Sequence, residues 1–286
     1  MAGRTALVVG GAGGGVGTAC VVLLVASGVQ VLVADREPSR LEQLQSRFPR
    51  AVQGVVADVT TDDGIDAVDR AVADAPVSAL VNVVGGVTPD EVGHFLELDP
   101  QAWRSSIDLN LTAAMRTCQV VARHMVSARR TGALVNLSVA DARHATPWFA
   151  AYGAARSALE ALTRTMAVEL GPLGIRANCV AWGLVNSPRA HAGNDSDGGR
   201  ERELIPLGRR GAVAEVAAAV LFLLSDLGSY VTGQCLAVDG GLTLRQSHYG
   251  PHHNIPEFLE SQPARTRLRS TFERLTGDGP CPYDSA

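Results

Sequence analysis

Short apolar runs alternate with longer amphipathic segments through the first 240 residues of the chain. The apolar runs have the length of strands and occupy residues 5–10, 29–35, 51–58, 77–85, 132–138, 175–181 and 234–239. Helical patterns fill the intervals, and the longest cover residues 99–125 and 150–170. Near-continuous apolar strands separated by helices are typical of a parallel sheet covered on both faces. The pattern therefore predicts a Rossmann-like, doubly wound fold with three α/β/α layers.

This alternation of predicted strands and helices ends near residue 241. Residues 186–203 are polar and glycine-rich, which is typical of a loop, and residues 242–286 show no strand pattern. A length of 286 residues suits one large α/β domain. We therefore expect a single domain over residues 1–241, followed by a C-terminal extension over residues 242–286.

Composition narrows the classes of partner. The net charge is -4 and 46% of the residues are hydrophobic, so the chain lacks the basic surface of a nucleic-acid-binding protein. Its apolar runs are too short to span a membrane. The five scattered cysteines favour a reducing compartment over a disulfide or metal framework. We expect a cytoplasmic protein that binds a small molecule and no metal, nucleic acid or membrane.

All 25 basic residues are arginine, as in proteins from GC-rich bacteria, where a role in specialised metabolism would fit.

A glycine-rich turn follows the first predicted strand and opens a helix. Gly11, Gly15 and Gly17 form a GxxxGxG pattern that also contains Gly14 and Val16. Glycines allow the backbone to approach a pyrophosphate closely, and the helix N-terminus supplies positive potential. A tight strand-to-helix turn without a ligand would use the same residues, so this pattern alone is a weak indicator.

Asp35 ends the second predicted strand, 20 residues after Gly15. A carboxylate at this place accepts hydrogen bonds from the ribose hydroxyls of an adenosine and repels a 2′-phosphate. Arg36 could instead receive that phosphate, but Gly14 supplies no second cation. The charges therefore favour NAD over NADP as the cofactor.

Several further motifs fit one family. They are "DV" at 58–59, "NVVG" at 82–85, "DLNLTAA" around Asn110, "YGAAR" at 152–156, "MAVELGPLGIRANCV" at 166–180 and "VDGG" at 238–241. Together with the glycine loop they resemble the short-chain dehydrogenase/reductase family over residues 4–241. The resemblance implies cofactor contacts from Asp58, Val59, Asn82, Gly85, Gly183, Val185 and Ser187, an active-site asparagine at Asn110, and a homodimer or homotetramer that pairs through the two long helices.

Tyr152 matches the tyrosine of the family's Tyr-x-x-x-Lys pair. The resemblance implies that its phenol is the general acid for ketone reduction and the general base for alcohol oxidation. Because free phenols lose their proton only near pH 10, this chemistry requires a neighbouring cation. Arg156 stands where the family has lysine and could bind the cofactor ribose, but a guanidinium does not exchange protons as lysine does.

The family's catalytic serine is also replaced. Counting thirteen residues back from Tyr152 gives Val139, and the nearest hydroxyl is on Ser138. Side chains alternate between the faces of a strand, so Ser138 would point away from the substrate unless a bulge shifts it. Candidate substitutes are Asp141 and His144, in a segment whose composition favours ordinary polar loop residues. Trp148 lies in the same predicted substrate segment.

These features favour an NAD(H)-dependent oxidoreductase that interconverts a secondary alcohol and a ketone. The expected catalytic residues are Tyr152, Arg156, Asn110 and Ser138. The substrate is a small metabolite, with cyclic and aromatic carbonyl compounds among the candidates. The two departures leave open a redox-neutral enzyme, such as an isomerase, dehydratase or cyclase, and a non-catalytic nucleotide-binding protein.

Overall fold

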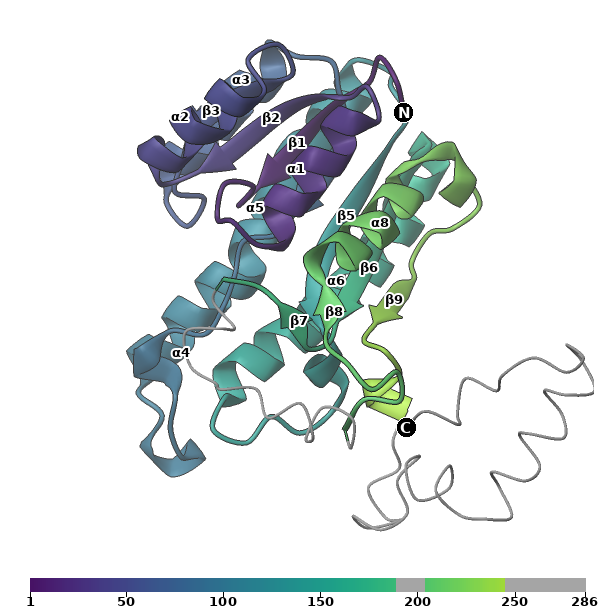
Figure 1. The fold of residues 1–286 in the computed structure, drawn as a ribbon. Coiled ribbons are helices and arrows are strands. Elements are labelled where there is room, and N and C mark those ends of the chain that lie inside the picture. Colours follow the sequence, from purple (N-terminus) through teal and green to yellow (C-terminus); the bar gives the residue numbers. More distant parts are fainter. Residues whose placement is uncertain (189–203, 245–286) are drawn as a thin grey trace, which may run out of the picture. The chain divides into compact units, whose positions relative to one another are not determined.

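A seven-stranded parallel sheet forms the centre of the computed structural model, which describes residues 1–188 and 204–244 (Figure 1). The strand order is β3-β2-β1-β4-β5-β6-β9. The chain begins at β1 in the middle of the sheet and adds β2 and β3 on one side. It then adds β4, β5, β6 and β9 on the other side, as in a doubly wound fold. The strands are β1 (Thr5–Val9), β2 (Gln30–Asp35), β3 (Val52–Val56), β4 (Val77–Asn82), β5 (Gly132–Val139), β6 (Ile175–Trp182) and β9 (Cys235–Val238).

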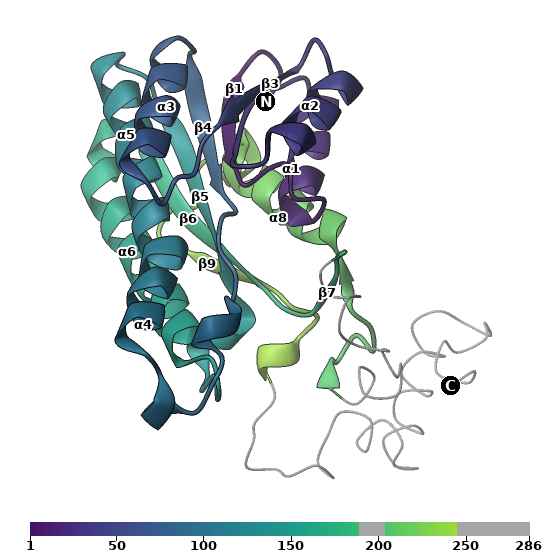
Figure 2. The ribbon, with the colours of Figure 1, turned by 90° about the vertical axis from the view of Figure 1, so that its left-hand side faces the viewer.

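Helices cover both faces of this sheet (Figure 2). On one side α1, α2 and α8 contribute to a shared apolar cluster, and on the other α3, α5 and α6 contribute to a second. The α-helices are α1 (Val16–Ala26), α2 (Pro38–Arg47), α3 (Asp62–Ala73), α4 (Pro100–Ile107), α5 (Ala113–Ser127), α6 (Ala150–Leu170) and α8 (Val213–Leu224). Two short strands, β7 (Val185–Asn186) and β8 (Gly211–Ala212), pair in parallel beside the main sheet. The three-layer Rossmann-like fold predicted from the sequence is confirmed.

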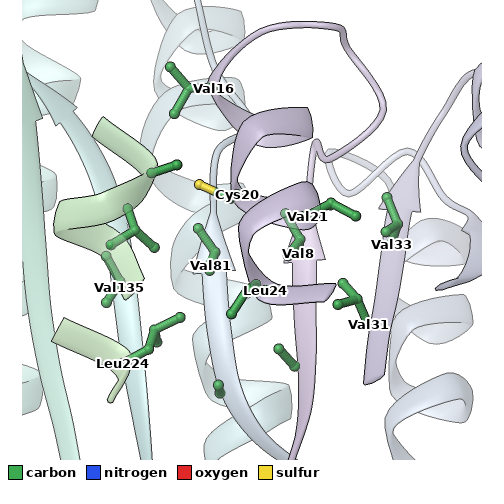
Figure 3. Close-up of a cluster of buried hydrophobic side chains, with 14 of the residues drawn as sticks. Val8, Val16, Cys20, Val21, Leu24, Val31, Val33, Val81, Val135 and Leu224 are labelled. Carbon is green, nitrogen blue, oxygen red and sulfur yellow. The ribbon is translucent and has the colours of Figure 1, made fainter. Parts of the chain in front are cut away.

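Strand alternation explains why both faces are apolar. On β1, Ala6 and Val8 pack into the cluster beneath α1 and α8, whereas Leu7 and Val9 pack into the cluster beneath α3 and α5. Figure 3 shows Val8 beside Val21 and Leu24 of α1 in the first of these clusters. A strand buried on both faces needs apolar residues at successive positions, which is the pattern seen in the sequence.

Several short helical turns connect the main elements. They are the 3-10 turns η1 (Pro89–Glu91), η2 (Phe95–Glu97), η4 (Ala140–Arg143), η5 (Gly171–Leu173), η6 (Asp226–Gly228) and η7 (Leu242–Leu244), and the π-helical turn η3 (Asp108–Thr112). The sequence predicts one helix over residues 99–125, but the structure inserts η3 between α4 and α5. A π-turn adds a residue to the helical repeat, a local change that hydrophobic periodicity does not reveal.

The described residues belong to two compact units. Residues 1–188 and 211–239 lie in the larger unit, and residues 204–210 with 240–244 lie in the smaller one. Within the smaller unit the Leu207 amide donates to the Gly240 carbonyl at 3.2 Å. Most of the predicted loop 186–203 and the extension beyond residue 244 lie outside the described residues. Among the described helices, none combines the length and the apolar character required to cross a membrane.

Candidate active site

The glycine-rich turn leads from β1 into the N-terminus of α1. Gly15 is the N-cap residue of α1, and neither a capping side chain nor an acidic residue occupies the first turn. The Thr18 hydroxyl accepts from the Gly14 amide at 3.0 Å and donates to the Gly11 carbonyl at 2.8 Å, which fixes the turn from below. A helix start with uncapped amides and no nearby carboxylate in its first turn is suited to binding an anion such as a pyrophosphate.

Two positions of the turn require glycine, for different physical reasons. A Cβ on Gly17 would collide with the carbonyl oxygen of Gly10, so glycine allows α1 to start directly against β1. Gly14 has a φ of +78°, which glycine adopts without steric cost. Val16 is buried beneath the turn. A Cβ on Gly15 would lie 3.9 Å from the Ser187 Cβ, so the segment after β7 faces the glycine turn.

Asp35 lies at the carboxyl end of β2, next to the glycine turn. One carboxylate oxygen accepts from the Ala12 amide at 3.0 Å, and the other accepts from the Glu37 amide at 3.3 Å. A carboxylate has about four acceptor positions, so these two bonds leave room for ribose hydroxyls. The exposed Arg36 guanidinium lies 3.8 Å from the Glu37 carboxylate.

Asp58 and Val59 follow β3 at the same edge of the sheet. The Asp58 carboxylate accepts from the Thr60 hydroxyl at 2.6 Å and from the Thr60 amide at 3.0 Å. The hydroxyl bond is the main reason that the pKa of Asp58 is lowered. Val59 is buried beneath this turn. The carboxylate therefore orders the loop between β3 and α3.

Tyr152 and Arg156 lie one turn apart on α6, as the sequence predicts. The guanidinium carbon lies 5.4 Å from the centre of the Tyr152 ring, a distance at which a cation is attracted by the aromatic face. The Arg156 side chain is only 3% exposed, and its Nη1 donates to the Leu137 carbonyl at 2.8 Å. Its Nε is buried and has no hydrogen-bond partner among the described residues.

Gly85 and Asn110 meet Arg156 at the end of β4. A Cβ on Gly85 would collide with Nη2 of Arg156, and it would lie 2.6 Å from Oδ1 of Asn110. The Asn110 Oδ1 accepts from the Gly86 amide at 2.9 Å, and its Nδ2 donates to the Gly86 carbonyl at 3.1 Å and the Ser106 carbonyl at 3.0 Å. The π-turn η3 therefore directs Asn110 to hold the β4–α4 loop against the Tyr152–Arg156 pair.

Ser138 is fully buried and faces α6. Its hydroxyl donates to Glu160 Oε1 at 3.2 Å and to the Arg156 carbonyl at 3.4 Å. The β5–β6 register runs without a shift from Gly132 to Val139, so no bulge turns the Ser138 hydroxyl to the other face. Val139 is buried at the end of β5. Glu160 and its partner Arg143 were not identified from the sequence; the only available signal was that Glu160 follows Arg156 by one helical turn.

Asn82 lies inside the core. Its Nδ2 donates to Asn136 Oδ1 at 2.9 Å, and its Oδ1 accepts from the Thr117 hydroxyl at 2.7 Å. Asn136 in turn donates to the Thr163 hydroxyl at 3.0 Å. The side chain of Asn82 thus links β4 to β5 and α5, and a cofactor contact by this residue would involve its backbone.

The loop after β5 carries the other candidate substrate residues. Asp141 is exposed in η4, and its backbone carbonyl accepts from the His144 amide at 3.0 Å. Trp148 has a φ of +72°, which is rare for a large side chain, and its carbonyl accepts from the Gly93 amide at 3.1 Å. The Trp148 ring meets the His94 ring edge to face at 6.0 Å between centroids. The loops after β4 and β5 are therefore joined at an aromatic contact.

Gly183 and Val185 follow β6 and continue the same edge. The Gly183 amide donates to the Val238 carbonyl at 3.1 Å, and Val185 pairs with Gly211 in the small parallel ladder. The described residues contain no cluster of three or more histidine, cysteine or acidic side chains that could hold a metal ion.

Comparison with known proteins identifies the family of this chain. Residues 11–243 match the family model described as Enoyl-(Acyl carrier protein) reductase. L-xylulose reductase from Mesocricetus auratus is 36% identical over 247 residues, which cover 84% of this chain and 97% of that protein. Galactitol 2-dehydrogenase (L-tagatose-forming) from Cereibacter sphaeroides is 37% identical over 240 residues, which cover 82% of this chain and 93% of that protein.

A solved structure extends the similarity to the fold. The short-chain type dehydrogenase/reductase from Mycobacterium ulcerans superposes with a TM-score of 0.79 at 31% identity, covering 94% of this chain and 98% of that one. Family model, relatives and solved structure agree on the family, and the solved structure shares the parallel-sheet fold. The chain belongs to the short-chain dehydrogenase/reductase family of oxidoreductases.

Proposed function

We propose that this protein is an NAD(H)-dependent oxidoreductase that interconverts a secondary alcohol and a ketone. The observation that carries the proposal is the Tyr152–Arg156 pair, with its buried guanidinium 5.4 Å from the phenol ring. The pair lies at the carboxyl edge of a parallel sheet, where ligands of open α/β folds bind.

The residues present fit a nicotinamide dinucleotide. The open amides at the start of α1 would bind the pyrophosphate, and Asp35 would accept from the adenosine ribose. The unpartnered Nε of the buried Arg156 offers a donor to the second ribose. When bound, the nicotinamide supplies the hydride chemistry.

Tyr152 moves the proton in this mechanism. Its phenol donates to the substrate oxygen during ketone reduction and accepts from the hydroxyl during alcohol oxidation. Arg156 places its buried guanidinium 5.4 Å from the centre of the phenol ring. Because the guanidinium keeps its own protons, Tyr152 regains its proton from water after ketone reduction and releases it to water after alcohol oxidation, without a lysine relay. Asn110 fixes the Gly85–Gly86 backbone beside this cation, which keeps the pocket wall in place.

NAD is the cofactor that the charges favour. The Asp35 carboxylate would repel a 2′-phosphate. Arg36, the nearest cation in sequence, lies beside Glu37, which weakens its attraction for a second anion. NADP would therefore bind with a charge conflict that NAD avoids.

Two substrate types deserve a direct comparison. The names of the L-xylulose and galactitol enzymes favour a small sugar or polyol. The aromatic contact between His94 and Trp148, together with the exposed Trp148 and Phe149, favours a cyclic or aromatic carbonyl compound. We propose a small carbonyl substrate from one of these two classes.

The experiment uses purified full-length protein and the Tyr152→Phe variant. NADH and NADPH are titrated in parallel by nicotinamide fluorescence, and a panel of ketoses and of cyclic and aryl ketones is screened by NADH absorbance. We expect tighter binding of NADH than NADPH in both proteins. We also expect turnover that falls by roughly 100-fold or more in Tyr152→Phe, as removal of a general acid commonly costs.

Two results would contradict this proposal. Equal turnover by wild type and Tyr152→Phe would show that the phenol is not needed for the reaction. Tighter binding of NADPH than NADH would show that Asp35 does not select against the 2′-phosphate. Tyr152→Phe serves as its own folding control, because it should still bind NADH.

A redox-neutral reaction is the second candidate, and one observation favours it. Val139 occupies the position at which the family resemblance places serine, while the hydroxyl of Ser138 is bonded to Glu160. An isomerase, dehydratase or cyclase that uses Tyr152 would convert its substrate without changing NADH absorbance. Mass spectrometric detection of product at constant NADH would support this candidate over the first.

A further inference from the structure

Glu160 is a buried charged residue on α6, next to the proposed catalytic pair Tyr152–Arg156. Tyr152, Arg156 and Glu160 are spaced four residues apart on α6 and share one face of the helix. Glu160 is only 5% exposed. It is one helical turn from Arg156, and none of the roles proposed above uses it.

Both oxygens of the Glu160 carboxylate are bonded to other elements. Oε1 accepts from the Ser138 hydroxyl of β5 at 3.2 Å, and Oε2 accepts from Nε of Arg143 in η4 at 3.1 Å. The Arg143 Nη2 then donates to the Cys235 carbonyl of β9 at 3.1 Å. One carboxylate and one guanidinium therefore connect α6 to β5, η4 and β9.

Arg143 stands at the start of the proposed substrate loop. η4 leads directly into residues 144–149, which end at the N-terminus of α6 just before Tyr152. The loop is thus held at its first turn by Glu160 and near its end by the Trp148–Gly93 bond. Between these points it carries His144, and its first turn includes Asp141.

A stabilising role alone is a weak explanation for this pair, because the Glu160 carboxylate is buried while the Arg143 side chain is half-exposed, and ion pairs with a solvated partner contribute little to stability. Removing a carboxylate from water is costly, and apolar replacements for buried ion pairs are often as stable as the pair. What an ion pair adds is defined geometry, since each charge requires its partner in one place. Here the Glu160 hydrogen bond raises the pKa of Arg143, as expected for a charge pair.

We infer that Arg143 and Glu160 are positioning residues that hold the 140–149 loop, and through it the substrate, against Tyr152. The inference rests on the proposed function. Ser138 acts in the same assembly, because its hydroxyl supports Glu160 and does not polarise the substrate carbonyl.

Two variants and two matched controls test this role in the full-length protein. Arg143→Gln removes the half-exposed cation, and Glu160→Gln removes the buried anion. The controls are Arg116→Gln and Asp62→Asn, which break the surface pair between α5 and α3 that is joined at 2.6 Å. Hydrogen–deuterium exchange of residues 140–149 is measured together with NADH affinity, kcat and substrate KM.

We expect Arg143→Gln to raise exchange in residues 140–149 about tenfold while exchange in α5 stays unchanged. Substrate KM should rise about tenfold, with NADH affinity and the melting temperature close to wild type. If Glu160→Gln folds poorly, Arg143→Gln alone still tests whether the pair positions the 140–149 loop. The controls should match the wild type in each measurement.

Two outcomes would overturn the inference. One is unchanged exchange in residues 140–149 of a folded Arg143→Gln protein. The other is a lower melting temperature with unchanged KM, which would indicate a structural role only. Failure of the proposed function is a separate result, because wild-type protein would then oxidise no NADH with any carbonyl substrate, whereas the exchange comparison needs no substrate.

Discussion

At the scale of single residues, a shift of one position along β5 decides whether a side chain faces α6 or the opposite face of the sheet. Ser138 and Val139 are neighbours, so their side chains leave the strand on opposite faces. The count back from Tyr152 identified this offset in the sequence, and strand alternation predicted that Ser138 would turn away. The structure shows no bulge and places the Ser138 hydroxyl on Glu160, which agrees with the alternation argument and gives no support to the expectation that Ser138 is catalytic. The partner itself was unpredictable, because it depends on how α6 packs across β5.

Restoring a hydroxyl at position 139 provides a residue-scale prediction. Val139→Ser should raise kcat/KM for ketone reduction about tenfold, the effect of roughly 1.4 kcal/mol from one hydrogen bond to a charge-developing oxygen. Steady-state kinetics with NADH and the best ketone of the screen would measure it.

Val139→Ala is the matched control, because it removes the same methyl groups without adding a hydroxyl. Equal changes in the two variants would mean that pocket volume, and not a missing hydrogen bond, sets the rate.

At the scale of elements, buried polar side chains fix how α5 and α6 lie on the sheet. Asn82 and Asn136 are register partners on β4 and β5, and they bond to each other, to Thr117 of α5 and to Thr163 of α6. The sequence placed each of these residues in the right element. It could not reveal the network, because the contacts join residues 27 to 54 positions apart.

Asn136→Ala should therefore destabilise the fold more than ordinary truncation of a polar side chain. It leaves Nδ2 of Asn82 without its asparagine partner and the Thr163 hydroxyl without its donor. Asn82 Nδ2 keeps its bonds to the Ala114 carbonyl and the Cys118 sulfur, and the Thr163 hydroxyl keeps its bond to the Leu159 carbonyl. Two lost hydrogen bonds at about 1 kcal/mol each give an expected loss of about 2 kcal/mol in the free energy of unfolding. Urea denaturation followed by circular dichroism would measure it.

Gln119→Ala is the control, since Gln119 is exposed on α5. A loss below about 0.5 kcal/mol in Asn136→Ala, the range of ordinary surface substitutions, would show that the network is not needed for stability.

At the scale of the whole molecule, the sequence was informative wherever the signal is local. Alternating apolar strands and helices predicted the parallel sheet, and the GxxxGxG turn lies at the start of α1 as expected. The π-turn at Asn110 and the Arg143–Glu160 pair were missed. Both arise from tertiary packing, which one sequence read by itself does not display.

Assembly is the prediction that belongs to this scale. The outer face of α6 exposes Val168 at 77%, and we propose that α5 and α6 pair with those of a second copy. Light scattering after size exclusion should give two or four times the 29.9 kDa chain mass. Val168→Glu should reduce that mass, because it would bury a charge in the interface.

Val56→Glu is the control for this change. Val56 is also exposed, at 58%, but it lies on β3 at the opposite edge of the sheet from β9. A monomeric wild type, or a Val168→Glu protein of unchanged mass, would contradict pairing through α6.

The contact between Arg156 and Gly85 also couples substitutions at these two positions. Because the guanidinium fills the space that a Cβ at position 85 would need, any larger residue there would displace Arg156 from beside the Tyr152 ring. A larger residue at position 85 therefore requires a shorter or repositioned side chain at position 156, so the two positions can be redesigned only together.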